Sequence, residues 1–159
     1  MEAVFGEKND FKSWIELVKI VSGNFPGLDL ECYKNILIEK IEKKETLVIK
    51  DGEKVVGALA FSYEEKEISF LAVNPEHRGR GIGLKLVKKV ISLFPLGTKV
   101  TVITYRAGDE KGENARKLYK KAGFSEGSLL TVFDYPCQEF IKKVAEAAGK
   151  EAVAWSREW

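Results

Sequence analysis

The sequence is poor in the residues that build disulfide frameworks and metal sites. Its 159 residues include two cysteines, Cys32 and Cys137, and a single histidine, His77. Two cysteines without a C-x-x-C spacing exclude a disulfide framework, and one histidine leaves a metal ion few ligands, so no metal site is expected. No apolar run reaches the 18 residues of a membrane span, and the first residues lack the basic and apolar regions of a signal peptide.

The chain also lacks a strong excess of charge of either sign. Its formal net charge is +2, with 45% hydrophobic and 31% charged residues, which are ordinary globular values. Nucleic-acid binding would require a basic excess on one face, so neither nucleic acid nor a membrane is expected as a partner. We expect a cytoplasmic protein with one domain at residues 1–144, followed by an extension of unknown role at residues 145–159.

Hydrophobic periodicity predicts a mixture of helices and strands. Helices are expected at residues 11–21, 30–41, 83–94 and 113–122. Strands are expected at residues 3–5, 46–50, 54–63, 67–73, 99–105 and 129–134. Asp51-Gly52 is a strong hairpin signal, and Tyr135-Pro136 indicates a second turn. The alternation of apolar and polar residues allows two interpretations of residues 137–143: a returning strand, or the start of a helix running to residue 148.

A glycine-rich stretch runs from Arg78 to Gly83, with the sequence Arg-Gly-Arg-Gly-Ile-Gly. It stands between an apolar, β-prone segment and a helical apolar pattern. Glycines leave backbone N–H groups uncovered at the start of a helix, where the macrodipole favours an anion such as a pyrophosphate. The stretch therefore predicts a ligand that carries phosphate groups.

The spacing of these glycines separates three kinds of phosphate loop. No Gly-Lys-Ser or Gly-Lys-Thr follows them, which excludes a P-loop. The glycines stand at 79, 81 and 83, so G-x-G-x-x-G fails, and no acidic residue follows about 20 positions later as a Rossmann fingerprint requires. The pattern that fits is R-x-x-G-x-G.

A second motif supports this assignment. Residues 114–124 match N-A-x-x-x-Y-x-x-x-G-F, with Asn114, Ala115 and Tyr119 leading into Gly123-Phe124. This motif, within residues 112–124, follows the glycine-rich stretch, and the strand expected at residues 99–105 lies between the two. With both motifs, the chain resembles the GNAT superfamily of acyl-CoA-dependent N-acetyltransferases, most specifically over residues 47–124.

This resemblance implies a fold and a cosubstrate. The fold would be α+β, a central twisted mixed sheet with helices on both faces, ending in a hairpin whose last strand we place at residues 138–142. The strand that holds residues 70–73 would splay from the next strand, at residues 99–105, and its exposed edge would pair with the pantetheine arm of acetyl-CoA. The cofactor-binding residues would be Leu71, Ala72, Val73, Arg78, Gly79, Arg80, Gly81, Ile82, Gly83 and Asn114.

The resemblance also assigns catalytic roles. Acetyl transfer to an amine needs a donor to the oxyanion of a tetrahedral intermediate, an acid for the departing thiolate and a route for the amine proton. The N–H of Val73 or its neighbour would be the donor, Tyr119 the acid and Glu67 the base acting through water. The other interpretation of Glu67 is an exposed carboxylate at a strand start. Asn114 is expected to cap its helix as well as to lie near pantetheine.

The acceptor is expected to be a primary amine of a small molecule or a peptide. The carboxylates of Glu64, Glu65, Glu67 and Asp134 suggest an acidic groove that attracts cationic amines. A homodimer is left open. Two other interpretations remain: a CoA-binding sensor or interaction module that keeps the fold without turnover, and a nucleotide-binding domain that uses the same glycines for another phosphate ligand.

Overall fold

A computed structural model describes residues 1–25 and 27–145 of the chain. The extension predicted at residues 145–159 therefore lies outside the described residues except for its first position. Within the described part, none of the helices is long and apolar enough to cross a membrane.

The centre of the molecule is a seven-stranded mixed sheet in the order β1-β2-β3-β4-β5-β7-β6. The strands are β1 (Val4–Phe5), β2 (Thr46–Asp51), β3 (Lys54–Ser62), β4 (Glu67–Val73), β5 (Lys99–Tyr105), β6 (Ser125–Val132) and β7 (Tyr135–Lys143). Neighbouring strands pair antiparallel except β4 and β5, which are parallel. The connection between these two strands is a helical crossover, as parallel pairing requires.

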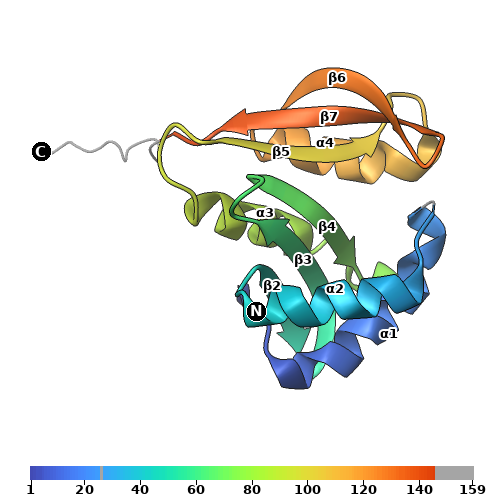
Figure 1. Cartoon of the computed structure of the whole chain (residues 1–159), viewed down its shortest axis with the longest axis vertical. Helices are drawn as coiled ribbons and strands as arrows, with labels where there is room; N and C mark the ends of the chain where they lie inside the picture. The colour runs from blue at the N-terminus through green and yellow to red at the C-terminus, as the bar shows by residue number, and fades with distance from the viewer. Residues whose placement is uncertain (26, 146–159) are drawn as a thin grey trace, which may run out of the picture.

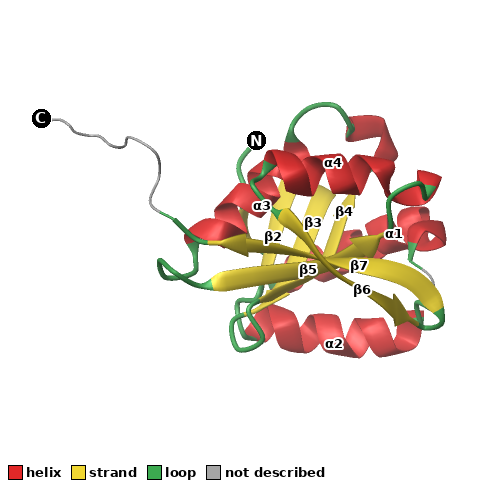
Figure 2. Ribbon diagram, turned by 90° about the horizontal axis from the view of Figure 1, so that it is seen from above, coloured by secondary structure: helices red, strands yellow, loops and turns green. Residues whose placement is uncertain are grey.

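Four helices cover the two faces of the sheet (Figures 1 and 2). They are α1 (Phe11–Val21), α2 (Leu30–Glu42), α3 (Ile82–Ser92) and α4 (Glu113–Lys121). The first two pack with Phe70 and Ala72 of β4 in one hydrophobic core. The other two pack with Ile68 and Phe140 in a second core on the opposite face. The predicted α+β architecture with helices on both faces is confirmed.

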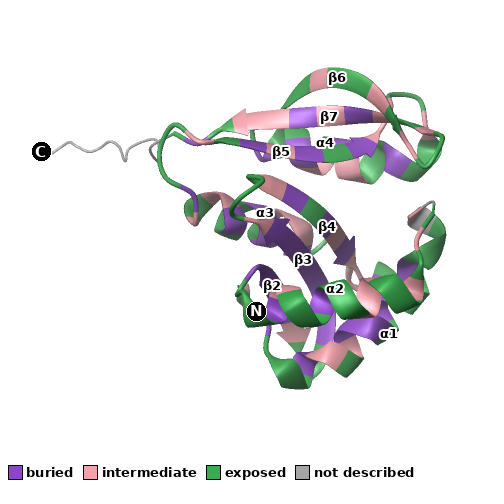
Figure 3. Cartoon of the chain, viewed as in Figure 1, coloured by how far each residue is buried: buried purple, intermediate pink, exposed green. Residues whose placement is uncertain are grey.

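The buried strand β3 separates these two cores, and most of its residues are inaccessible (Figure 3). Gly57 in β3 permits α3 to approach closely, since a Cβ at this position would lie 2.4 Å from Cγ2 of Ile82. The N-terminus of α3 is thereby held against the sheet, beside the end of β4.

The β6–β7 hairpin differs in detail from the sequence prediction. The strand predicted at residues 138–142 is confirmed and extends over Tyr135–Lys143, so the alternative helix from residue 137 is wrong. The turn falls at Phe133-Asp134, both with positive φ, and not at Tyr135-Pro136. β6 begins at Ser125, four residues before the predicted start at residue 129. The prediction missed these residues because a bulge between Glu126 and Leu129 interrupts the alternation by which a strand is recognised.

The pairing of β4 with β5 is confined to one end of the two strands. Only Glu67 with Thr101 and Ile68 with Val102 are paired, although each strand is seven residues long. Beyond Ile68 the strands diverge (Figure 1). The splay that the family resemblance implied is therefore present.

Candidate active site

A cleft of about 1170 Å³ lies along the divergence of β4 and β5. Its walls come from the whole of β4, the second half of β5, the N-terminus of α3, the inner side of α4, the loop between α1 and α2, and the β6–β7 turn. The cleft therefore brings segments from both halves of the sheet to one place. A splayed parallel pair is needed for this, because a continuous ladder would close the space.

The edge of β4 that faces the cleft carries backbone groups without strand partners. The N–H of Asn74 donates to the carbonyl oxygen of Val56 in β3, at 2.8 Å. Backbone groups of successive strand residues point to opposite edges, so the N–H groups of Val73 and Leu71 point away from β3. No β5 residue pairs with either of them among the described residues. Two backbone donors thus face the space where the sheet is open.

The glycine loop meets the cleft at Gly79 and Gly81. Both have positive φ, +80° and +76°, and a Cβ at either position would meet no atom within 4 Å. Gly81 is the N-cap of α3, so open space adjoins the uncovered N–H groups of the first helical turn. This arrangement fits an anion held by the backbone, as the phosphates of coenzyme A would require.

The other residues of the predicted phosphate site divide into two groups. Arg78, Ile82 and Gly83 line the cleft together with Leu71, Ala72 and Val73 of β4, whereas Arg80 does not. Gly83 has a second role that the sequence did not indicate. A Cβ there would lie 2.9 Å from Cδ2 of Leu118, so this glycine allows α3 and α4 to pack closely.

Tyr119 lies in α4, with its side chain between the sheet and the cleft. Its ring contacts those of Phe124 and Phe140, with centroids 5.6 Å and 6.2 Å away, and only 4% of the residue is exposed. Burial raises the pKa of this phenol above its usual value. Within the described part of the chain its hydroxyl has no hydrogen-bond partner, although the residue lines the cleft. A neutral, uncommitted O–H donor is therefore available at the cleft wall.

Glu67 begins β4 and lines the same cleft. Burial raises the pKa of its carboxyl, and the negative charges of Glu65 and Glu139 raise it further, while Lys40 opposes the shift. A carboxylate whose pKa lies closer to neutrality is a better proton acceptor at physiological pH. The side chain makes no hydrogen bond or ion pair with any described residue, so it is free to meet a ligand.

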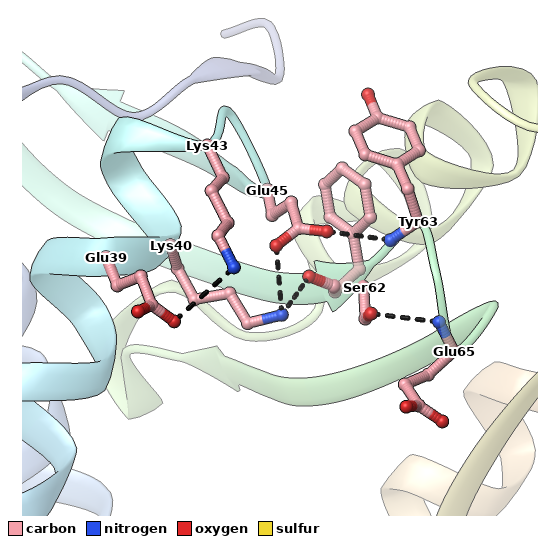
Figure 4. A network of polar contacts seen from close by, with 8 residues as sticks. Glu39, Lys40, Lys43, Glu45, Ser62, Tyr63 and Glu65 are labelled. Carbon is pink, nitrogen blue, oxygen red and sulfur yellow. Dashed lines mark hydrogen bonds and ion pairs between the residues drawn. The ribbon is translucent and has the colours of Figure 1, made fainter.

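Lys40 belongs to a polar network that connects the end of α2 with the end of β3 (Figure 4). Its Nζ donates to the carbonyl oxygen of Phe61 at 2.6 Å and pairs with Glu45 at 3.3 Å. The other carboxylate oxygen of Glu45 accepts the backbone N–H of Tyr63 at 2.8 Å. The network therefore fixes the end of β3, which leads into β4 and Glu67.

The predicted helix-capping role of Asn114 is wrong. Gly112 is the N-cap of α4, and Asn114 stands inside the first turn with an exposed side chain. A glycine occupies the cap because a Cβ at residue 112 would clash with Tyr105, at 2.2 Å from its Cβ. Asn114 does line the cleft, so its expected position near the pantetheine arm stays a prediction.

Several wall residues were not recognised as site residues from the sequence. They lie on the side of the cleft away from the glycine loop and are Cys32, Tyr33, Ile36 and Phe133. In the sequence, the α2 members look like parts of an ordinary apolar stripe. Of the four carboxylates expected to make this side acidic, only Glu67 lines the cleft, and Glu64, Glu65 and Asp134 do not. The groove is mainly apolar.

Comparison with known proteins agrees with the fold and the two motifs. A model of the acetyltransferase (GNAT) family matches residues 14–124, and the chain belongs to this family. Its members are acetyltransferases, so the class of this protein is that of an acyltransferase. No match was found among curated proteins.

Solved structures of acetyltransferases share the fold. A GNAT-family acetyltransferase from Bacillus cereus ATCC 10987 is 18% identical, with a TM-score of 0.73 over 89% of this chain and 96% of that one. A ribosomal-protein-alanine N-acetyltransferase from Brucella melitensis is 17% identical, with a TM-score of 0.69 over 90% and 99%. The putative acetyltransferase yncA from Salmonella typhimurium, solved with acetyl-CoA, is 15% identical, with a TM-score of 0.67 over 94% and 96%.

Proposed function

We propose that this protein transfers an acetyl group from acetyl-CoA to a primary amine. One observation carries the proposal: a single cleft joins an open glycine loop at a helix N-terminus, two N–H groups on a strand edge, and the hydroxyl of Tyr119. Neither these N–H groups nor this hydroxyl has a partner among residues 1–25 and 27–145. Family membership and the solved structure of a relative with acetyl-CoA support the same cosubstrate.

The glycine loop would hold the phosphates. Backbone N–H groups around Gly79 and Gly81 and the positive end of the α3 dipole favour an anion there, and Arg78 adds a positive charge. Acetyl-CoA supplies the activated thioester. The unpaired edge of β4 would form hydrogen bonds with the pantetheine amides, as it would with an added β-strand. This binding would direct the thioester along β4 toward the rest of the cleft.

Three groups of the chain would act at the reacting atoms. The N–H of Val73 donates a hydrogen bond to the carbonyl oxygen as negative charge develops on it. Glu67, with its raised pKa, takes the proton of the amine through water. Tyr119 donates to the departing sulfur. Because burial raises the pKa of this phenol, it stays protonated at neutral pH and stabilises the thiolate by hydrogen bonding.

Ligand-dependent thermal stability tests the first part of the proposal. We expect acetyl-CoA and desulfo-CoA to stabilise the protein, by about 2.7 kcal/mol at 100 times the dissociation constant, and NAD and ATP to have a much smaller effect. Stabilisation by NAD or ATP alone would favour a nucleotide-binding domain instead.

Release of free CoA with a panel of amines tests the second part. We expect amine-dependent release, with the acetylated amine detected by mass. Binding of acetyl-CoA without any turnover across the panel would contradict the enzyme and favour a CoA-binding sensor.

A further inference from the structure

The part of the cleft away from the glycine loop, here called the acceptor arm, has an aromatic wall. Phe25 stacks on Phe70 with ring centroids 4.7 Å apart, and Tyr33 packs on the same ring at 5.2 Å. The Tyr33 oxygen accepts a hydrogen bond from the Trp14 indole at 2.8 Å, so this hydroxyl is directed toward α1. Leu28 and Ile36 continue the apolar surface. The wall therefore offers ring faces and aliphatic groups to a ligand.

The acceptor arm contains one uncommitted carboxylate. Glu67 has no hydrogen bond or ion pair within the described residues, whereas Asp29 caps α2 by accepting the N–H groups of Glu31 and Cys32, at 3.1 Å and 3.3 Å. The other charged side chains that line the cleft lie in the glycine loop, in the loop before α4 and on α4: His77, Arg78, Glu110, Lys111 and Lys121. One free carboxylate beside apolar walls suits a ligand with one ammonium group, because each further unpaired charge would be costly to desolvate there.

A contact between two loops closes one side of the acceptor arm. Phe133 at the β6–β7 turn packs directly on Gly27 in the α1–α2 loop, since a Cβ on Gly27 would lie 2.6 Å from Cγ of Phe133. Phe133 and Asp134 both adopt positive φ, +50° and +61°, which is uncommon for residues other than glycine. The phenylalanine is nevertheless 74% exposed. A backbone conformation that is locally unfavourable thus holds a large apolar side chain over the arm.

We propose that the acceptor is a compact primary monoamine with an aromatic or aliphatic body, and that Phe133 sets the upper limit on its size. This inference rests on the proposed acetyltransferase function and specifies its substrate class. The apolar wall receives the body of the amine, Glu67 receives the amino group, and the Phe133–Gly27 contact obstructs a chain that extends outward from it. Polyamines lack the apolar body, and a peptide chain would have to extend past the Phe133–Gly27 contact.

The test compares three acceptors with the wild-type protein: phenethylamine, spermidine, and a tetrapeptide amide that begins with phenylalanine. We expect kcat/KM for phenethylamine to exceed both others by at least about tenfold, the scale of discrimination that an apolar pocket provides. A higher kcat/KM for spermidine or for the peptide would overturn the proposal.

Substitution of Phe133 tests its role as a size limit. We expect Phe133→Ala to raise kcat/KM for the peptide at least about tenfold and to change that for phenethylamine much less. Leu129→Ala is the matched control, because Leu129 is 61% exposed on the same hairpin but does not line the cleft. An unchanged ratio of the two acceptors in Phe133→Ala would remove Phe133 from the proposal.

The two levels of the proposal fail in distinguishable ways. If CoA release depends on an amine but spermidine or the peptide is preferred, the proposed substrate class is wrong and the proposed acetyltransferase function is still supported. Absence of CoA release with every amine, under conditions in which acetyl-CoA still raises the melting temperature, overturns both.

Discussion

Ile68 and Phe70 are two residues apart in β4, yet they lie in different hydrophobic cores on opposite faces of the sheet. In a regular strand, residues i and i+2 point to the same face. The register shift between β3 and β4 explains the difference, because Phe61 pairs with Ile68 and Ala60 with Phe70, which leaves Ser69 as an extra residue. This β-bulge falls where β4 parts from β5, and a bulge both bends a strand and ends its pairing. The bulge therefore accounts for the opening of the cleft.

Removal of the Tyr119 hydroxyl tests its role at the sulfur. We expect Tyr119→Phe to lower kcat at least about tenfold, a lower bound beneath the roughly hundredfold or more that is typical of general acid catalysis, while affinity for acetyl-CoA stays close to wild type. Tyr63→Phe is the control, since Tyr63 is 41% exposed and does not line the cleft. Steady-state kinetics with calorimetric measurement of CoA binding would decide, and an undiminished kcat would eliminate this assignment.

The pH dependence of kcat/KM tests Glu67 as the base. A base must be deprotonated to act, so activity falls as the pH drops through its pKa, and the raised pKa of Glu67 places this acidic limb above the usual range of a glutamate. We expect Glu67→Gln to abolish the limb. Glu65→Gln should move it to lower pH, because the charge of Glu65 contributes to the raised pKa. Identical profiles in all three proteins would contradict a catalytic Glu67.

Two glycines in the same left-handed conformation allow an effect on ligand binding to be distinguished from an effect on stability. Gly81 and Gly97 have φ of +76° and +86°, and a Cβ at either would meet no atom, but only Gly81 lines the cleft. Alanine at either position should destabilise the fold by about 1 kcal/mol, the cost of a left-handed non-glycine residue. Gly81→Ala should in addition weaken acetyl-CoA binding at least about tenfold, because its methyl group enters the phosphate site. Equal affinities of the two variants would argue against a phosphate ligand at Gly81.

The network of Figure 4 offers a matched pair of stability mutants. Lys40→Met leaves the carboxylate of Glu45 without its cation, and the two side chains are only 16% and 9% exposed. We expect a loss of about 3 kcal/mol in the free energy of unfolding. Lys43→Met removes the exposed pair with Glu39 and should cost less than about 0.5 kcal/mol. Urea denaturation measures both, and similar values would show that the Lys40–Glu45 pair is not structurally important.

The sequence predicted those features that depend on local pattern. The β2–β3 hairpin followed from Asp51-Gly52, and α3 and α4 followed from apolar residues at helical spacing. β6 was predicted too short, because the extra residue in its bulge breaks the period of two. The same limit applied to β4, whose splay entered the prediction through the family resemblance alone.

The candidate site was predictable where a motif marks it and not where the walls are generic. The glycine loop and Tyr119 carry recognisable spacing, and both line the cleft. Tyr33 and Ile36 lie on a helix whose apolar positions look like ordinary core residues. The contact of Phe133 with Gly27 joins segments about a hundred residues apart through a turn whose φ angles no propensity favours. Such contacts depend on tertiary structure.

The short pairing of β4 with β5 has a mechanical consequence. Two lobes of the sheet are joined there by only two residue pairs, while the apolar core beneath α3 continues across the boundary from Leu59 to Val102. A molecule as large as a nucleotide with a long arm can therefore be wedged between the lobes without unzipping any ladder of backbone hydrogen bonds. Its entry therefore leaves the secondary structure intact.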